Sequence, residues 1–246
     1  MNPTSGSTLR TISTRFVPLF LLSTSLIIFP CASAMASAQK VFCFGDSLTA
    51  GTSPPLNEEF PYAAHLERTL RSEYPLHAEV LVRWKGFPGW TAPNLQQEGN
   101  LGNTMDNIEA NAGPLDLVII LAGTNDLAHE TDSETIVNSI KQIHNIAHAK
   151  KVKTLCLGIP PSAWQTQSED TREVAESVNS KLKSWAMGDG QGSDSRLVGF
   201  APFPIVSYDN SSGLWCGDGL HLSPLGYKFV GENLAPIIAN ILSESN

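Results

Sequence analysis

The sequence has 246 residues, of which 41% are hydrophobic, and its formal net charge is −8. A chain of this length and composition can bury a full hydrophobic core, which excludes an intrinsically disordered protein. Its acidic balance, with no basic patch, would be repelled by phosphate backbones and therefore excludes nucleic acid as a partner.

Residues 1–38 have the features of a secretory signal peptide rather than of a folded domain. Arg10 and Arg15 give a basic start with no acidic residue, and an apolar run follows at 16–30. Small residues at 32–38 offer cleavage sites, and the apolar run is short for a membrane span. We therefore expect cleavage, a secreted or periplasmic location and no stable membrane insertion afterwards. A retained signal anchor or an organellar transit peptide is the alternative.

The first strand-like run after this leader, residues 40–45, leads directly into Gly45-Asp46-Ser47-Leu48. An apolar strand followed by glycine and a small hydroxyl residue places that hydroxyl at the carboxyl edge of the sheet, where open α/β sheets bind ligands. A serine hydroxyl becomes a useful nucleophile only beside a base that removes its proton and a third group that orients the base. Ser47 is therefore a candidate nucleophile if the chain supplies these partners.

Strand-like and helix-like patterns alternate through residues 39–246, which we expect to form a single domain. The run at 115–122 is almost entirely apolar, as a central parallel strand covered on both faces should be. The alternation predicts an α/β fold with three layers, α/β/α, and a parallel sheet of about five strands. The expected strands are 40–45, 78–84, 115–122, 152–158 and 196–201, and the expected helices are 60–74, 133–150, 169–187 and 224–242.

Two turns that follow the second and third strands contain candidate donors for an oxyanion. Gly89, in Phe-Pro-Gly-Trp-Thr, could offer a backbone N–H that no side chain blocks. Asn125, in Gly-Thr-Asn-Asp, could donate from its side-chain amide to a developing negative charge. The alternative for both is an ordinary turn residue. Because both turns lie at one edge of the predicted sheet, we expect them to meet Ser47.

Other polar clusters and cysteines have simpler expected roles. His144 and His148 lie four residues apart on a predicted helix and could bind zinc, but the metalloprotease pattern lacks its glutamate, so we expect exposed helix positions. The turn cluster at 188–194 could be an anion nest or a calcium loop; its spacing fits neither, and a surface loop is expected. Cys43 and Cys156 lie in strand-like runs and are expected to be buried as small hydrophobic residues.

His221 has an acidic partner nearby in the sequence, in the loop that opens the last predicted helix. Asp218 lies three residues before it, with the flexible Gly219 between them. This spacing lets one turn bring the carboxylate to the imidazole Nδ1–H, which leaves Nε2 free to face a serine. The alternative is a helix cap, because an aspartate before a helix often only accepts from backbone N–H groups. Together with the Ser47 turn, the pattern favours catalysis.

Four blocks, in the expected order, make the sequence resemble the SGNH, or GDSL, family of serine esterases and lipases. The blocks are 45–48 (Gly-Asp-Ser-Leu), Gly89, 123–126 (Gly-Thr-Asn-Asp) and 218–221 (Asp-Gly-Leu-His), so the resemblance covers essentially the whole chain after the leader. The Phe-Pro-Gly-Trp-Thr stretch looks most like single-domain arylesterase or lysophospholipase-type members. The resemblance implies a flavodoxin-like SGNH hydrolase fold over residues 39–246.

The resemblance also implies roles for five residues. Ser47 would be the nucleophile, His221 the general base and Asp218 the group that orients the base. The backbone N–H groups of Ser47 and Gly89 and the side-chain amide of Asn125 would form the oxyanion hole. Neither a metal ion nor an organic cofactor would be needed.

The expected function is therefore hydrolysis of small-molecule carboxylic esters through an acyl-enzyme. No long insertion suggests a lid, so we expect an open cleft and short-to-medium acyl substrates, with lysophospholipids and carbohydrate acetyl esters also open. Candidates for apolar contacts are Trp84, Phe87, Trp90 and Trp164, although Trp84 falls inside a strand pattern and could equally belong to the core.

Two functions of other classes are alternatives to ester hydrolysis. One is a catalytically idle carbohydrate-binding module that keeps the same fold, against which the intact serine, aspartate and histidine argue. The other is a flavodoxin-like nucleotide site. It is disfavoured because Asp46 would stand where the phosphate should bind.

Overall fold

The computed structural model describes Met1 and residues 38–77, 79–188 and 196–244. The chain from 37 to 246 forms one unit by its internal contacts. The predicted signal peptide and most of the turn cluster at 188–194 lie outside the described residues. Within the described part of the chain, no helix is both long and apolar enough to cross a membrane.

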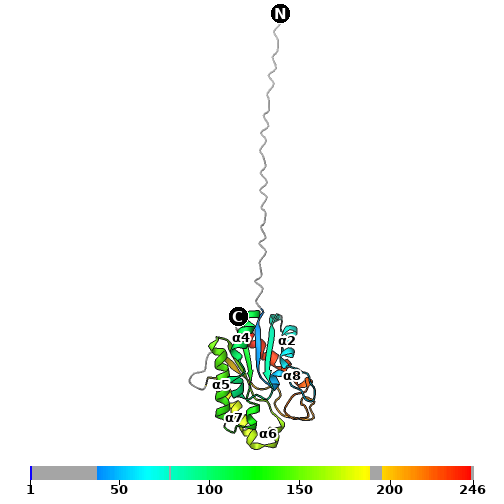
Figure 1. The fold of residues 1–246 in the computed structure, drawn as a ribbon. Helices are drawn as coiled ribbons and strands as arrows, with labels where there is room; N and C mark the ends of the chain where they lie inside the picture. Colours follow the sequence, from blue (N-terminus) through cyan, green and yellow to red (C-terminus); the bar gives the residue numbers. More distant parts are fainter. Residues whose placement is uncertain (2–37, 78, 189–195, 245–246) are drawn as a thin grey trace. The chain divides into compact units, whose positions relative to one another are not determined.

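Five parallel strands form the centre of this unit, in the order β2-β1-β3-β4-β5 (Figure 1). The predicted α/β fold with a five-stranded parallel sheet is therefore confirmed. The chain passes from β1 outward to β2 on one side and continues to β3 on the other, so the strand order reverses at the carboxyl ends of β1 and β3. The strands are β1 (Lys40–Asp46), β2 (Leu81–Phe87), β3 (Leu117–Leu121), β4 (Lys153–Leu157) and β5 (Leu197–Ala201).

The strand whose bounds differ most from the prediction is β2, which begins and ends three residues later than expected. A short 3-10 helix at Pro75–His77 occupies the preceding chain, and Val80 N donates to His77 O at 2.9 Å. Because β2 is an edge strand, part of it faces solvent, and Trp84 is 39% exposed. A core position for Trp84 is therefore excluded.

Four long helices occur close to their predicted bounds. They are α2 (Tyr62–Glu73), α5 (Ser133–Ala149), α7 (Glu169–Ala186) and α8 (Pro224–Ser243). Local caps explain where they begin: Asp132 accepts from the first turn of α5, and Ser223 accepts from Gly226 N before α8. Pro224 opens α8, where its missing N–H costs nothing.

Three further α-helices of five or more residues have no counterpart among the predicted elements. They are α3 (Ala92–Gln97), α4 (Leu101–Ala112) and α6 (Ala163–Gln167). In α4 only Leu101 and Met105 are buried, so the sequence carries little of the periodicity that marks an amphipathic helix. Hydrophobic periodicity therefore does not mark α4, whereas α3 begins at a local capping box formed by Thr91 and Asn94.

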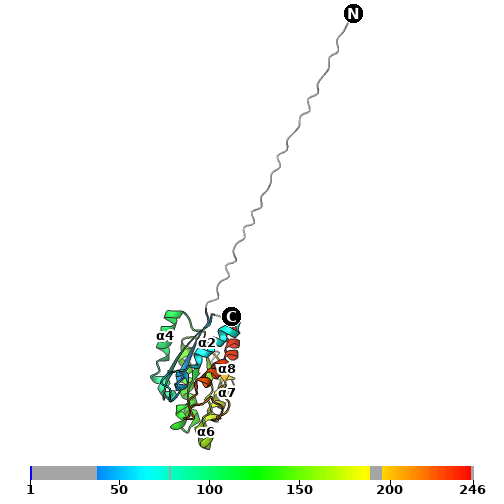
Figure 2. The ribbon, with the colours of Figure 1, turned by 90° about the vertical axis from the view of Figure 1, so that its right-hand side faces the viewer.

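Successive residues of β1 point to opposite faces of the sheet and enter two separate cores. Val41 and Cys43 pack with α2 and α8, whereas Phe42 and Phe44 pack with α3, α4, α5 and α7. Figure 2 shows α2 and α8 on one side of the sheet and α4 on the other. The burial predicted for Cys43 and Cys156 is confirmed, and it raises the pKa of both thiols to about 12.

His144 and His148 are buried, so the prediction of exposed positions was wrong. They are 0% and 3% exposed, and both imidazoles hydrogen bond to the hydroxyl of Thr154 on β4, at 2.7 and 2.8 Å. His144 also packs edge-on against the ring of Trp185. A neutral imidazole can extend the apolar face of α5 because the strand beneath supplies a polar partner. In the described parts of the chain, no three His, Cys, Asp or Glu side chains could together hold a metal ion.

Acid is expected to weaken the fold through His144. Burial, followed by the charge of the neighbouring His148, lowers the pKa of His144 from 6.5 to about 3. Below pH 6.5 the unfolded chain therefore binds a proton here that the folded protein does not bind. The contribution of His144 to the free energy of unfolding should fall by up to about 1.4 kcal/mol per pH unit as the pH drops from 6 towards 4. Urea denaturation of the wild type and of His144→Gln at several pH values measures this contribution.

The comparison with His144→Gln is needed because Asp46 titrates in the opposite sense. Burial raises the pKa of Asp46 to about 7, so its protonation favours the folded state as the pH falls. Asp46 is present in both proteins, and its effect cancels in their difference. The stability advantage of the wild type over His144→Gln should shrink with acidification. A difference that stays constant from pH 7 to pH 4 would contradict this role of His144.

Candidate active site

Three side chains from opposite ends of the chain form one hydrogen-bonded series. His221 Nε2 lies 3.0 Å from Ser47 Oγ, and His221 Nδ1 lies 2.7 Å from Asp218 Oδ2. Ser47 directly follows β1, whereas Asp218 and His221 lie in the loop before α8. This arrangement lets the imidazole take the serine proton while the carboxylate fixes its tautomer and orientation.

The backbone around Ser47 turns sharply from β1 into the short helix α1 (Ser47–Ala50). Asp46 caps this helix, because its Oδ1 accepts from Leu48 N at 2.9 Å. Gly51 ends it with a φ of 89°, a left-handed conformation that glycine adopts readily. Ser47 is only 4% exposed, so its hydroxyl lies at the base of the site and is held by ordered backbone on both sides.

Asp218 both orients the imidazole and caps its own turn. Its Oδ1 accepts from the N–H groups of Leu220 and His221, each at 3.0 Å, while Oδ2 faces His221 Nδ1. Partial burial acts to raise the pKa of Asp218, but the hydrogen bonds from the imidazole and from these N–H groups outweigh it and lower the pKa. The carboxylate is therefore charged at neutral pH and can stabilise an imidazolium. Asp218 therefore makes both contacts considered from the sequence: it caps its turn and it hydrogen bonds to the imidazole of His221.

Backbone hydrogen bonds brace the loop that holds His221. Cys216 N donates to His221 O at 2.8 Å, and Ala163 N donates to Gly219 O at 2.8 Å. Gly219 has a φ of 67°, and a Cβ there would lie 2.5 Å from the Cβ of Ala163, so a larger residue would not fit. The bracing sets the position of His221 before any substrate binds.

The turns that contain Gly89 and Asn125 contact each other at the edge of the sheet where Ser47 lies. Asn125 Nδ2 donates to the carbonyl of Trp90, the residue after Gly89, at 2.9 Å. This uses one amide hydrogen; the second has no acceptor among the described residues. β1 lies between β2 and β3, from which these turns emerge. Gly89 has a φ of 79°, and a Cβ there would contact nothing within 4 Å. Glycine is therefore favoured at this position by the backbone conformation and not by a lack of space.

Two buried acidic residues support the site, although sequence reasoning gave them no such role. Asp126 Oδ2 accepts from Ala92 N at 2.9 Å and so ties the Asn125 turn to α3. Asp46 is fully buried; burial raises its pKa to about 7, and the negative charge of Asp126 adds to this. The only hint in the sequence of a supporting role was that Asp46 and Asp126 are adjacent to Ser47 and Asn125 in the motifs. Periodicity could not show that they are buried.

Apolar surface lies next to the Asn125 turn. A hollow of about 320 Å³ is lined by Leu127 and by Trp164, which is 39% exposed. On the other side, Phe87 stacks on Trp90 with ring centroids 4.4 Å apart. Phe87 is the last residue of β2, Trp90 follows it, and Trp164 follows β4, so all three lie toward the edge of the sheet at which Ser47 lies. They offer apolar surface of the kind that ligand sites use.

Comparisons with known proteins show the family and the fold of the chain. The model of the GDSL-like lipase/acylhydrolase family matches residues 43–229, which include all five predicted site residues. An acetyl esterase mutant with bound acetate ion superposes with a TM-score of 0.60 at 18% identity, over 85% of this chain and 100% of that chain. A carbohydrate esterase of family 3 from Talaromyces cellulolyticus gives 0.59 at 19% identity, over 84% and 99%.

A third similar structure is the inhibitor-bound aryl esterase of M. smegmatis, with a TM-score of 0.58 at 23% identity, over 83% of this chain and 100% of that chain. At these identities the solved structures are evidence for the fold alone. The comparison with curated proteins found no significant match.

Proposed function

The chain belongs to the GDSL-like lipase/acylhydrolase family and is a carboxylic ester hydrolase, and from this premise we propose that it is a secreted serine esterase with Ser47 as its nucleophile. The observation that carries the proposal is the 3.0 Å contact between Ser47 Oγ and His221 Nε2. A serine hydroxyl at hydrogen-bond distance from an oriented imidazole has the geometry that acyl transfer requires.

In the first half of the proposed reaction, His221 removes the proton from Ser47 Oγ as this oxygen attacks the ester carbonyl carbon. The imidazolium that forms faces the charged Asp218. Collapse of the tetrahedral intermediate breaks the bond to the alcohol oxygen, which leaves with the proton from His221. The acyl group remains bound to Ser47.

In the second half, His221 removes a proton from a water molecule that attacks the acyl-enzyme. A second tetrahedral intermediate forms. It collapses with release of the carboxylic acid, and His221 returns its proton to Ser47 Oγ. During both halves the negative charge on the former carbonyl oxygen needs donors. We assign this role to the N–H groups of Ser47 and Gly89 and to the free amide hydrogen of Asn125.

The proposed substrates are esters with short-to-medium acyl groups. The similar structures are named as an acetyl esterase, an aryl esterase and a carbohydrate esterase, which supports acetyl groups on aryl or sugar alcohols as candidates. Lysophospholipids are a further candidate. Secretion is proposed from the basic, apolar and small-residue segments of residues 1–38.

Hydrolysis of a series of 4-nitrophenyl esters, from acetate to laurate, tests the proposed substrate class. The purified protein should release nitrophenolate in proportion to protein concentration, fastest for the shorter acyl chains, and treatment with EDTA should not reduce the rate. Release no faster than in buffer would contradict esterase activity. Rates that rise steadily up to laurate would contradict the assigned acyl range.

Replacing Asn125 with alanine should lower kcat by about 100- to 1,000-fold, because a donor to the transition-state oxyanion is lost. KM should change little, since the interaction forms mainly in the transition state. Asn233→Ala, an exposed asparagine on α8, is the matched control and should behave like the wild type. A reduction of less than tenfold for Asn125→Ala would remove Asn125 from the oxyanion hole.

A further inference from the structure

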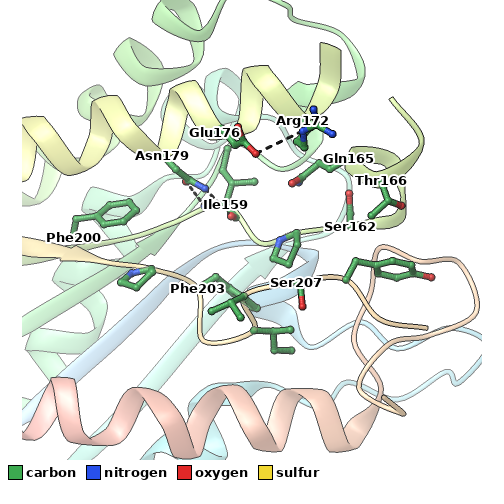
Figure 3. A pocket seen from close by; sticks show the side chains of 15 residues that line it. Ile159, Ser162, Gln165, Thr166, Arg172, Glu176, Asn179, Phe200, Phe203 and Ser207 are labelled. Carbon is green, nitrogen blue, oxygen red and sulfur yellow. Dashed lines mark hydrogen bonds and ion pairs between the residues drawn. The ribbon is translucent and has the colours of Figure 1, made fainter. Parts of the chain in front are cut away.

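A second cavity, of about 410 Å³, lies beside the loop that holds His221 but includes none of the residues of the candidate active site. Figure 3 shows it between α7 on one side and the segment that follows β5 on the other. Its volume is in the range of small-molecule binding sites. A ligand bound in this cavity would therefore not contact the residues proposed for ester hydrolysis.

Ser162 is a polar residue in the wall of this cavity. It is 2% exposed and occupies the N-cap position of α6, yet its side chain makes no cap hydrogen bond. Its hydroxyl has no partner among the described residues and lines the cavity, near Gln165 (Figure 3). This oxygen is not among the fully enclosed polar atoms, so a ligand in the cavity can reach it and hydrogen bond to it.

The charged side chains that line the cavity are one guanidinium and one carboxylate, Arg172 and Glu176, whose charges sum to zero. Arg172 pairs with Glu169 at 2.9 Å and with Glu176 at 3.7 Å, so its positive charge is already compensated. Gln165 donates to Pro160 O at 2.8 Å, which leaves its carbonyl oxygen to accept. An anionic ligand would meet Glu176, and a cationic ligand would meet Arg172. The surroundings therefore suit a neutral ligand with several hydroxyl groups.

The remaining wall of the cavity is apolar and partly aromatic. Phe200 and Phe203 line it together with Ile159 (Figure 3), and Phe203 is 4% exposed. A ligand that fits must therefore present one apolar face as well as hydroxyl groups. A pyranose ring has both, because its C–H bonds form an apolar face and its hydroxyl groups surround the rim.

We propose that this cavity binds a neutral sugar ring of a glycan, as an accessory site distinct from the Ser47 site. It adjoins the catalytic loop, because Ala163, the residue after Ser162, donates to Gly219 O at 2.8 Å. The site holds the protein on a carbohydrate while Ser47 acts on an ester. It goes beyond the proposed esterase function and does not depend on it.

Binding of unesterified neutral oligosaccharides, followed by calorimetry and by saturation-transfer NMR, tests the proposal without any hydrolysis. The probes are cello-, xylo-, manno- and chito-oligosaccharides. At least one should bind, and Ser162→Ala and Arg172→Met should each weaken it about fivefold, the loss expected for one hydrogen bond. Ser180→Ala, an exposed serine on α7 outside the cavity, should leave the affinity unchanged. Thermal unfolding of each variant controls for loss of fold.

Three results would overturn the accessory site. One is that no oligosaccharide of the series binds at millimolar concentrations. Another is binding that is equally strong in Ser162→Ala, Arg172→Met and the wild type, which would place the sugar elsewhere. The third is displacement of the sugar by decanoate, which would make the cavity an acyl site. Ester hydrolysis is measured on the same samples, so failure of the sugar site and failure of the esterase are distinguishable.

Discussion

Replacing Ser47 with alanine is expected to lower kcat for 4-nitrophenyl acetate by roughly four to six orders of magnitude. The variant removes only the oxygen that His221 Nε2 faces at 3.0 Å, so no covalent intermediate can form. The oxyanion donors and the binding surfaces remain, which sets the residual rate above that of water. Initial rates with enzyme at high concentration measure the effect.

The control for this variant is Ser53→Ala. Ser53 is also buried, at 1% exposed, and its Oγ contacts Cys216 Sγ at 3.3 Å rather than an imidazole. It should therefore keep its activity within about an order of magnitude. Comparable rates for Ser47→Ala and the wild type would show that another group attacks the ester.

Replacing Gly45 with alanine is expected to have the largest effect on the fold. A Cβ at this position would lie 2.2 Å from Leu121 O and 2.5 Å from Thr49 Oγ1. The closer atom belongs to the backbone of β3, which pairs with β1 through these same two residues. Relief would require the two central strands to separate, so we expect a loss of more than about 3 kcal/mol in the free energy of unfolding. Urea denaturation measures the loss.

Gly102→Ala is the matched control for the Gly45 variant. Gly102 lies within α4, where a Cβ would meet the flexible end of Lys150 at 3.3 Å and Ile146 Cγ2 at an ordinary contact distance of 3.6 Å. Alanine is the better helix former, so this variant should be as stable as the wild type or more stable by about 0.5–1 kcal/mol. Equal stabilities for Gly45→Ala and Gly102→Ala would mean that β1 and β3 can move apart at little cost.

The sheet and the long helices could be predicted from the sequence because hydrophobic periodicity reflects which residues are buried. The residues of β3 are all buried, and an unbroken apolar run is what such a strand requires. The same principle fails for α4, which buries few residues, and for α5 at His144. There a polar residue is buried because Thr154, from a strand later in the chain, provides its hydrogen bond. No local pattern contains that partner.

Some features of the candidate site could likewise be predicted from the sequence, and others could not. The turns around Ser47 and His221 could be read from their residue types, since nucleophile, base and acid are chemically distinctive. The support given by Asp46 and Asp126 could not be read, because it depends on burial and on a contact with the start of α3. The cavity at Ser162 is likewise absent from any motif. It arises where α6 and α7 meet the segment after β5.

Labelling by a fluorophosphonate, located by mass spectrometry of the peptides, tests the activation of Ser47 most directly. The probe forms a bond with a serine oxygen and releases fluoride only when a neighbouring base activates that oxygen. The wild type and His129→Ala, which changes an exposed histidine, should be labelled at Ser47. His221→Ala should lose the label while keeping its thermal stability. A label on another residue, or undiminished labelling of His221→Ala at Ser47, would contradict the pairing of these two side chains.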